Sequence, residues 1–249
     1  MTNLEKQLDQ LERDGYLIIP NALTPEETEQ VRQKINYGRE QGWQEGLNEV
    51  GNMWFDTFLE RDPETFEPLV AHKSIRPYLE TLMGPQLQLR SFRAHINPGP
   101  YLQEWHMDFY GYWMQPKRRL SVQGVAINTT FYLQDNAPGI AHLKFVKHGH
   151  LFEPHAVHPS KMRGLDCEFR QWCEKQEHVV LYPKAGDCVL FFSHMPHQGA
   201  KEDDSVERSN VVCHYQSNPF YEGVWFVSRT KGEGIYPLGR PQGRDDSYA

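Results

Sequence analysis

The 249-residue sequence lacks four features that would assign it to a specialised class of protein. No apolar run approaches the roughly 18 residues of a transmembrane helix, so we expect no membrane span. The four cysteines include no Cys-x-x-Cys pair, which is typical of reduced thiols rather than of a disulfide framework. Lys and Arg number 26 against 33 Asp and Glu, a net charge of −7, which argues against a nucleic-acid ligand. The first segment, MTNLEKQLDQ, is charged and has no apolar signal-peptide core, so we predict a cytoplasmic protein.

Histidine and aromatic residues, by contrast, are abundant. The 13 Phe, 12 Tyr and 6 Trp can build a core, and the chain length suits one large domain. Most of the 12 histidines lie between residues 106 and 214. This clustering favours a metal site in that part of the chain, although most of these histidines individually are expected to have no such role.

The N-terminal part has the pattern of helices. Leucines recur at helical spacing in a first predicted helix that ends before Gly15. Thr24-Pro25-Glu26-Glu27 combines an N-cap, a proline at the first helical position and a capping-box glutamate. It predicts a second helix to about residue 38. A further helix is predicted over residues 78–83, whereas residues 41–68 have no clear pattern.

From about residue 86 the pattern changes to short strands in which apolar and polar residues alternate. Helices followed by many short strands indicate an α+β protein with a mainly β core, either an antiparallel sandwich or a barrel. We expect one domain over 1–249, with a helical part over about 1–85, a core over about 86–218 and a C-terminal extension over about 219–249. The predicted strands are 87–96, 125–133, 143–146, 178–182, 187–192 and 211–216, with a helical insert over about 165–174.

The segment His106-Met107-Asp108 brings a histidine and a carboxylate to the same side of an extended backbone, where both can bind one metal ion. A histidine from a distant strand would complete a 2-His-1-carboxylate triad. Such a triad leaves open positions on the metal and suits a non-haem Fe(II) oxygenase. The His-x-Asp pair by itself is a weak signal.

Two histidines, His194 and His197, follow the apolar strand 187–192, and Arg208 comes shortly after them. Strand alternation would turn His194 away, and the spacing to Arg208 favours His197 as the third ligand. An oxygenase of this type needs a two-electron donor. A 2-oxo acid chelated to the metal, with its far carboxylate bound by Arg208, meets that need.

These motifs resemble those of the phytanoyl-CoA dioxygenase family of Fe(II)- and 2-oxoglutarate-dependent oxygenases. The resemblance extends from the segment 14–20 and the helix that follows it to Tyr215. It implies a double-stranded β-helix core (a jelly-roll or cupin-like fold) with flanking N-terminal helices. It also implies O₂ activation and release of succinate and CO₂.

Matched to the family motifs, His106, Asp108 and His197 fall on the Fe(II) ligands. Arg208 falls on the arginine that binds the C5 carboxylate of 2-oxoglutarate, and Gln103 falls where some members contact this cosubstrate. Two segments depart from the family pattern, Asn136-Ala137-Pro138-Gly139 and Lys147-His148-Gly149-His150. Gly199 also departs from it, because some relatives have a serine there.

Several other residues are candidates for contacts within the pocket. Asn128 and Thr130 lie on a predicted pocket-facing strand and are expected to contact the cosubstrate. Tyr110 and Trp113 are candidates for substrate binding, although packing in the barrel wall is an equal alternative. His148, His150, His155 and His158 could suggest a second metal site, but we interpret them as part of a polar loop.

The predicted function is therefore hydroxylation of a C–H bond of a small metabolite, with Fe(II), 2-oxoglutarate and O₂. The same site could also desaturate, epimerise or cyclise its substrate. A non-catalytic metal-binding jelly roll and a zinc hydrolase are the rival interpretations, and neither explains Arg208. We expect a small-molecule substrate, no nucleic-acid or membrane partner, and a monomer or homodimer.

Overall fold

The computed structural model describes residues 2–49, 51–83, 87–108, 126–151 and 168–217. Its first part is mainly helical, with α1 (Asn3–Asp14), β1 (Tyr16–Ile19), α2 (Pro25–Glu40), β2 (Gly46–Leu47), β3 (Met53–Phe55), α3 (Phe58–Arg61), α4 (Pro63–Val70) and α5 (Arg76–Met83). The second part is mainly strands: β4 (Leu87–Asn97), β5 (Tyr101–Leu102), β6 (Ala126–Tyr132), β7 (Ala141–Val146), the 3-10 turn η1 (Gly149–Leu151), α8 (Glu168–Glu174), β8 (His178–Leu181), β9 (Cys188–Phe192), β10 (His197–Lys201) and β11 (Arg208–Ser217).

Local sequence signals set the ends of the first two helices. The Thr24 side chain accepts from the backbone N–H of Glu27, and the Glu27 carboxylate accepts from the backbone N–H of Thr24, as the predicted capping box requires. Helix α1 ends at Gly15, whose φ of 84° is in the left-handed region that glycine adopts without strain. No helix in the described part of the chain is long and apolar enough to cross a membrane.

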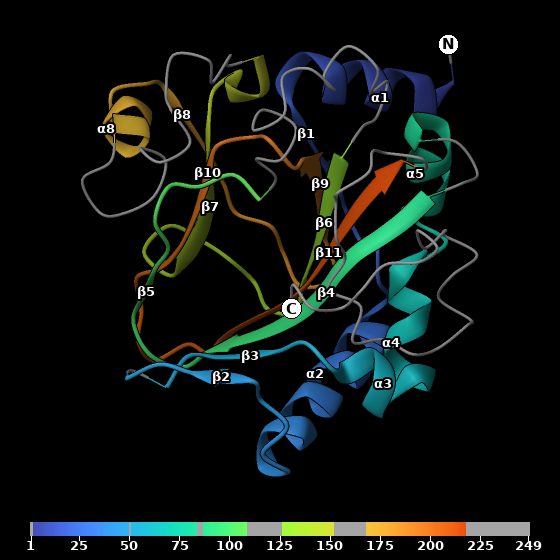
Figure 1. The fold of residues 1–249 in the computed structure, drawn as a ribbon, viewed down its shortest axis with the longest axis vertical. Coiled ribbons are helices and arrows are strands. Elements are labelled where there is room, and N and C mark those ends of the chain that lie inside the picture. The colour runs from blue at the N-terminus through green and yellow to red at the C-terminus, as the bar shows by residue number, and fades with distance from the viewer. Residues whose placement is uncertain (1, 50, 84–86, 109–125, 152–167, 218–249) are drawn as a thin grey trace, which may run out of the picture.

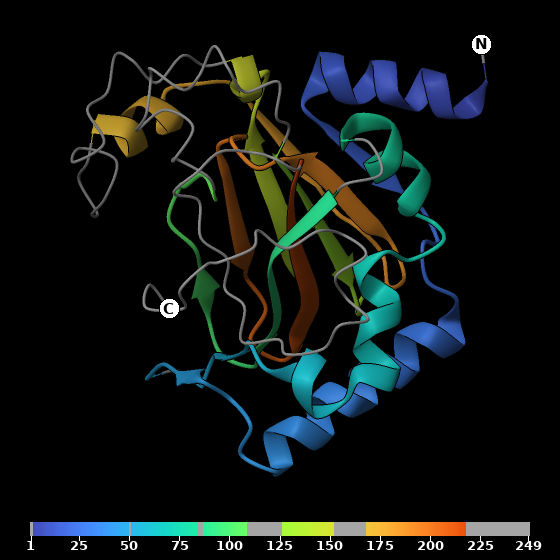
Figure 2. The ribbon, with the colours of Figure 1, turned by 45° about the vertical axis from the view of Figure 1, so that its right-hand side comes forward.

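The strands form two antiparallel sheets that face each other (Figures 1 and 2). The larger sheet has seven strands in the order β1-β9-β6-β11-β4-β3-β2, and the smaller has four in the order β5-β10-β7-β8. The fold is thus the expected double-stranded β-helix with flanking N-terminal helices. We call the two sheets the major and the minor sheet.

The main hydrophobic core lies between the helices and the outer face of the major sheet (Figure 1). Stacked rings form part of it, for example Phe58 and Phe66, whose centroids are 4.4 Å apart. A second cluster lies between the two sheets and includes Tyr132, Phe145 and Phe191. Tyr132 and Phe191 of this cluster also line a cavity between the two sheets, which provides space for a site.

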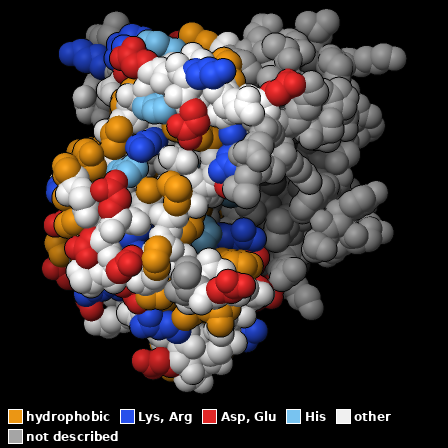
Figure 3. Space-filling view, turned by 90° about the vertical axis from the view of Figure 1, so that its left-hand side faces the viewer, with side chains coloured by type: hydrophobic (Ala, Val, Ile, Leu, Met, Phe, Trp, Pro, Cys, Tyr) orange, Lys and Arg blue, Asp and Glu red, His pale blue; other side chains and the backbone are white. Residues whose placement is uncertain are grey.

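The expected strands and helices are confirmed within the described residues, with two sets of additional elements and one changed boundary. Residues 41–68, which gave no clear pattern, form β2, β3, α3 and α4. β5 and β10 were not predicted, and β11 begins at Arg208 rather than at residue 211. The extension 219–249 lies outside the described residues. On the face in Figure 3, acidic and basic side chains are intermixed.

Candidate metal and cosubstrate site

The two histidines of the predicted triad are brought together by the backbone. His106 and His197 form an isolated antiparallel bridge in which each backbone N–H donates to the other residue's carbonyl, at 3.1 and 2.9 Å. Asp108 is anchored in the same way, because its N–H donates to the carbonyl of Ser193 at 3.0 Å. Segments far apart in the sequence therefore present their side chains to one point.

The side chains at that point can hold a metal ion. His106 Nε2 lies 3.4 Å from Asp108 Oδ1, and His197 Nε2 lies 3.3 Å from Asp108 Oδ2. One ligand atom from each residue lies within 4.8 Å of the others. Two imidazoles and one carboxylate form the donor set that non-haem Fe(II) accepts with open positions.

Hydrogen bonds at the far side of each imidazole fix which nitrogen faces this point. His106 Nδ1 donates to the carbonyl of Glu104 and His197 Nδ1 to the carbonyl of Met195, each at 2.8 Å. In a neutral imidazole the other nitrogen, Nε2, then carries the lone pair that a metal needs. Two lone pairs facing a carboxylate are stabilised by a cation between them, so the arrangement fits a metal ion.

The Asp108 carboxylate is held in its charged form. Burial alone would raise its pKa, but the His197 and His214 rings, when protonated, hold the pKa of this carboxyl well below its usual range. The Asn128 amide also donates to Asp108 Oδ2 and accepts at 2.6 Å from the Ser193 hydroxyl. Asp108 is therefore an oriented carboxylate at neutral pH.

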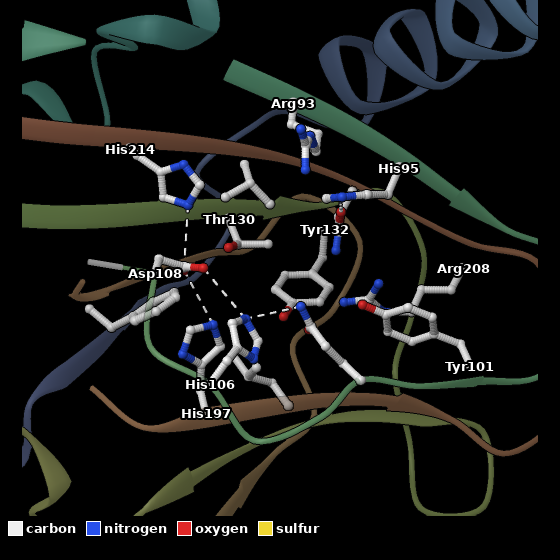
Figure 4. A pocket seen from close by; sticks show the side chains of 15 residues that line it. Arg93, His95, Tyr101, His106, Asp108, Thr130, Tyr132, His197, Arg208 and His214 are labelled. Atoms are coloured by element: carbon white, nitrogen blue, oxygen red, sulfur yellow. Dashed lines mark hydrogen bonds and ion pairs between the residues drawn. The ribbon is translucent and has the colours of Figure 1, made fainter. Parts of the chain in front are cut away.

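Arg208 lies at the other end of the same cavity (Figure 4). Its side chain is buried, with 5% of the residue exposed, and Nη1 donates to Asn97 Oδ1 at 2.9 Å. The guanidinium carbon lies 5.1 Å from the centre of the Tyr101 ring. Within the described residues the guanidinium forms no ion pair, and its buried Nε has no hydrogen-bond partner. A buried charge of this kind requires an anion, which a ligand carboxylate can supply.

Two neighbours of Arg208 affect the binding of an anion. Gly199 leaves room beside the guanidinium, and His95 adds no positive charge to the cavity. A Cβ at position 199 would lie 3.4 Å from Arg208 Nη2 and 3.3 Å from Gln103 Oε1, so Gly199 leaves room between these groups. Burial, together with Arg93 and Arg208, lowers the pKa of His95 to about 3, so His95 is neutral. The cavity can therefore accept an anion at Arg208 and a metal at His106, Asp108 and His197.

Comparison with known proteins agrees with this geometry. The family model of phytanoyl-CoA dioxygenase (PhyH) matches residues 11–203, which is most of the chain. The chain belongs to the phytanoyl-CoA dioxygenase family. Members of this family are 2-oxoglutarate-dependent non-haem iron enzymes, so the expected enzyme class is confirmed. No curated protein sequence matches the chain significantly.

Solved structures with the same fold include three proteins of low sequence identity. The non-haem α-ketoglutarate-dependent epimerase SnoN from nogalamycin biosynthesis is 16% identical over 97% of this chain and 98% of its own, with a TM-score of 0.69. The carbocyclase SnoK from the same biosynthesis is 19% identical over 87% and 84%, also with a TM-score of 0.69. HygX from Streptomyces hygroscopicus, solved with nickel, 2-oxoglutarate and hygromycin B, is 15% identical over 89% and 90%, with a TM-score of 0.60.

The remaining predicted site residues of this PhyH-family chain have different placements. Gln103 and Thr130 line the cavity, and Gln103 Nε2 lies 3.0 Å from His106 Nε2. Asn128, expected to contact the cosubstrate, instead lies behind Asp108 and bonds to it. Tyr110 and Trp113 lie outside the described residues.

His194 points away from the triad. Its Nε2 lies 3.1 Å from the carbonyl oxygen of His150, and its ring packs against Phe192. The sequence-based reason was a strand that continues past His194, but β9 ends at Phe192 and β10 begins at His197. The turn between the two strands, rather than strand alternation, sets the direction of His194.

The histidines of the predicted polar loop bond to the backbone of α1. His148 Nδ1 lies 3.1 Å from the Arg13 carbonyl and His150 Nε2 lies 2.9 Å from the Glu12 carbonyl. Such carbonyls at a helix C-terminus have no partner within the helix. His148 and His150 thus attach α1 to the rest of the fold, and His155 and His158 lie outside the described residues.

Sequence reasoning missed one residue beside the triad. His214 lies on β11 with its Nε2 3.4 Å from Asp108 Oδ2, and it lines the cavity. Once β11 is extended back to Arg208, alternation places Arg208, Asn210, Val212 and His214 on one face of the strand. The sequence therefore held a signal for this residue, but the predicted strand began too late to show it.

Proposed function

We propose that this enzyme binds Fe(II) through His106, Asp108 and His197, binds 2-oxoglutarate against Arg208, and hydroxylates a C–H bond of a small molecule. The bound iron would supply O₂ activation coupled to decarboxylation of 2-oxoglutarate to succinate and CO₂. The observation that carries the proposal is a buried arginine, paired only with neutral groups among the described residues, in the same cavity as a triad of metal ligands.

Arg208 gives the site its selectivity for a dicarboxylate. Its planar guanidinium can form two parallel hydrogen bonds to a carboxylate, whereas a lysine ammonium is a point charge. Asn97 holds one end of the guanidinium and the Tyr101 ring lies against it, so the group is oriented before the ligand arrives. Gly199 leaves the adjoining space open.

The residues around the metal ligands orient the triad. The carbonyls of Glu104 and Met195 fix the His106 and His197 rings, and Asn128 holds Asp108. Gln103 and Thr130 line the cavity and are candidates for further contacts to 2-oxoglutarate. A zinc hydrolase would need the metal ligands but would have no use for Arg208.

Hydroxylation is one of several outcomes that this type of site supports. SnoN is an epimerase and SnoK a carbocyclase, and both share this fold. At 16 and 19% identity these enzymes bear on the fold alone, and the outcome must be measured on the product.

The test is an assay of succinate formation in which the purified enzyme receives Fe(II), ascorbate, 2-oxoglutarate, O₂ and pools of small metabolites. We expect at least one pool to raise succinate formation and to yield a product that carries one atom of oxygen from ¹⁸O₂. An unlabelled product of unchanged mass would indicate epimerisation instead of hydroxylation. An unlabelled product that lacks two hydrogen atoms would indicate desaturation or cyclisation. If no succinate forms with or without the pools, the chain is a non-catalytic metal-binding protein. Conversion of a pool metabolite in the absence of 2-oxoglutarate would indicate a hydrolase.

A further inference from the structure

His214 contacts the metal carboxylate from the side opposite the two ligand histidines. In Figure 4 it lies on one side of Asp108, with His106 and His197 on the other. Its Nε2 is 3.4 Å from Asp108 Oδ2, and its side chain is 16% exposed. Nothing in the metal-binding motif of His106, Asp108 and His197 requires a further histidine at this place.

The backbone around His214 is arranged to aim it at Asp108. In the major sheet β11 lies between β4 and β6, and His214 is paired with Ser91 on one side and Asn128 on the other. The pairing with β4 shifts in register between His214 and Tyr215. Irregularities of this kind occur often beside active sites, where they redirect a side chain. Alternation along β11 places His214 on the cavity side, and Tyr215 points the other way, with its hydroxyl donating to the carbonyl of Val70 at 2.6 Å.

A hydrogen bond at the far nitrogen fixes the role of the His214 ring. Ser91 Oγ contacts His214 Nδ1. With the Ser91 hydroxyl donating to Nδ1, the neutral ring carries its proton on Nε2, which faces the carboxylate oxygen of Asp108. Ser91 thus directs the Nε2 N–H of His214 toward Asp108 Oδ2 across 3.4 Å, at the same oxygen to which the Asn128 amide donates.

We propose that His214, oriented by Ser91, is a positioning residue for the metal ligand Asp108. Nε2 of His214 and the amide of Asn128 both face Asp108 Oδ2, so together they restrict rotation of the carboxylate and favour one orientation toward the metal. Outer partners of this kind raise metal affinity by roughly 10- to 100-fold. The inference rests on the proposed metal site and adds a residue that the triad motif does not contain.

The test uses cobalt(II) as a stable probe metal and compares affinity by calorimetry with the visible absorption of the bound ion. His214→Phe keeps an aromatic ring and removes the donor, and we expect roughly 10- to 100-fold weaker cobalt binding and an altered absorption band. His214→Gln places an amide near the position of Nε2 and should recover most of the affinity. His95→Phe is the matched control, because it removes another cavity histidine that bonds to Asn210 rather than to Asp108; it should bind cobalt as the wild type does.

Each outcome decides between positioning and packing. If His214→Phe binds cobalt as tightly as His95→Phe, or if His214→Gln is no better than His214→Phe, His214 does not position Asp108. Should His214→Phe fail to fold, Ser91→Ala serves instead: several-fold weaker binding supports the proposal and unchanged binding overturns it. Wild-type protein that binds no cobalt at all contradicts the proposed metal site itself, which is a separate result.

Discussion

The two walls of the cavity differ in how regularly they are built. The wall from the major sheet is built on a paired strand: β11 is paired with β4 from Arg208 to Ser217, with one register shift after His214, and with β6 from Asn210 to Gln216. It presents Arg208, Asn210, Val212 and His214 in alternation. The wall from the minor sheet side is irregular: His106 and His197 meet in an isolated bridge, and Asp108 lies outside any strand. The regular wall carries Arg208, the proposed carboxylate-binding group, and the irregular wall carries the proposed metal ligands.

The two walls therefore position their side chains by different interactions. On the regular wall, cross-strand pairing places each side chain, so one substitution should remove one contact and leave the others in position. On the irregular wall, two backbone hydrogen bonds between His106 and His197 and the turn at 193–196 place the ligands. Substitutions on the two walls should therefore separate metal binding from cosubstrate binding.

The largest expected effect lies on the irregular wall. His197→Ala removes a proposed metal ligand, and we expect it to lose both stoichiometric Fe(II) binding and succinate formation. His194→Ala should keep measurable amounts of each, because His194 bonds to the His150 carbonyl and points away from Asp108. Anaerobic Fe(II) titration of the two folded variants makes the comparison. If His194→Ala loses iron and His197→Ala retains it, His194 and not His197 is the third metal ligand.

On the regular wall, Arg208→Ala should leave Fe(II) binding largely intact and weaken 2-oxoglutarate. A lost charge-assisted contact of about 1.5–3 kcal/mol corresponds to a rise of roughly 10- to 150-fold in the apparent 2-oxoglutarate constant. Arg93→Ala is the control. Arg93 also lines the cavity, but its guanidinium is bound by both oxygens of Asp56, so we expect little change. An unchanged constant in Arg208→Ala, with a raised one in Arg93→Ala, would transfer the role to Arg93.

A smaller effect should appear in the pH dependence of stability. Burial lowers the pKa of His194 to about 4 from its ordinary value of 6.5. As the pH falls below 6.5 the unfolded chain takes up a proton that folded His194 does not, so the free energy of unfolding declines until the pH approaches 4. The contribution of His194 is on the order of 1 kcal/mol between about pH 7 and about pH 5.5. Denaturant unfolding should show a shallower pH dependence for His194→Ala, and parallel curves would contradict the neutral state of His194.

Much of the fold followed from local patterns. Alternation predicted β4, β6, β7, β8 and β9, and the capping box predicted α2, because these signals depend only on neighbouring residues. β10 was missed because its sequence His-Gln-Gly-Ala-Lys is polar, although all five residues are buried between β5 and β7. Its burial comes from its partners, which the local pattern does not contain.

The site was predictable where it depends on a motif and not where it depends on register. His106, Asp108, His197 and Arg208 were named from spacing and resemblance, and the structure brings all four to one cavity. The placement of Asn128 behind Asp108 requires knowing which residue of β6 faces which residue of β11. A short segment does not encode that pairing, whereas His214 follows from alternation once β11 begins at Arg208.

The left-handed turn at Gly15 links the start of the chain to the metal site. Its carbonyl accepts from the backbone N–H of Phe192, and a side chain at this position would overlap the His150 ring and contact Met195 Sδ at 3.0 Å. Met195 in turn supplies the carbonyl that orients His197. In a genetic screen for inactive variants, replacements of Gly15 should therefore be recovered together with those of the iron ligands, although this glycine is remote from them in sequence. Inactivating mutations would then include changes at Gly15, a residue outside the proposed metal and cosubstrate site.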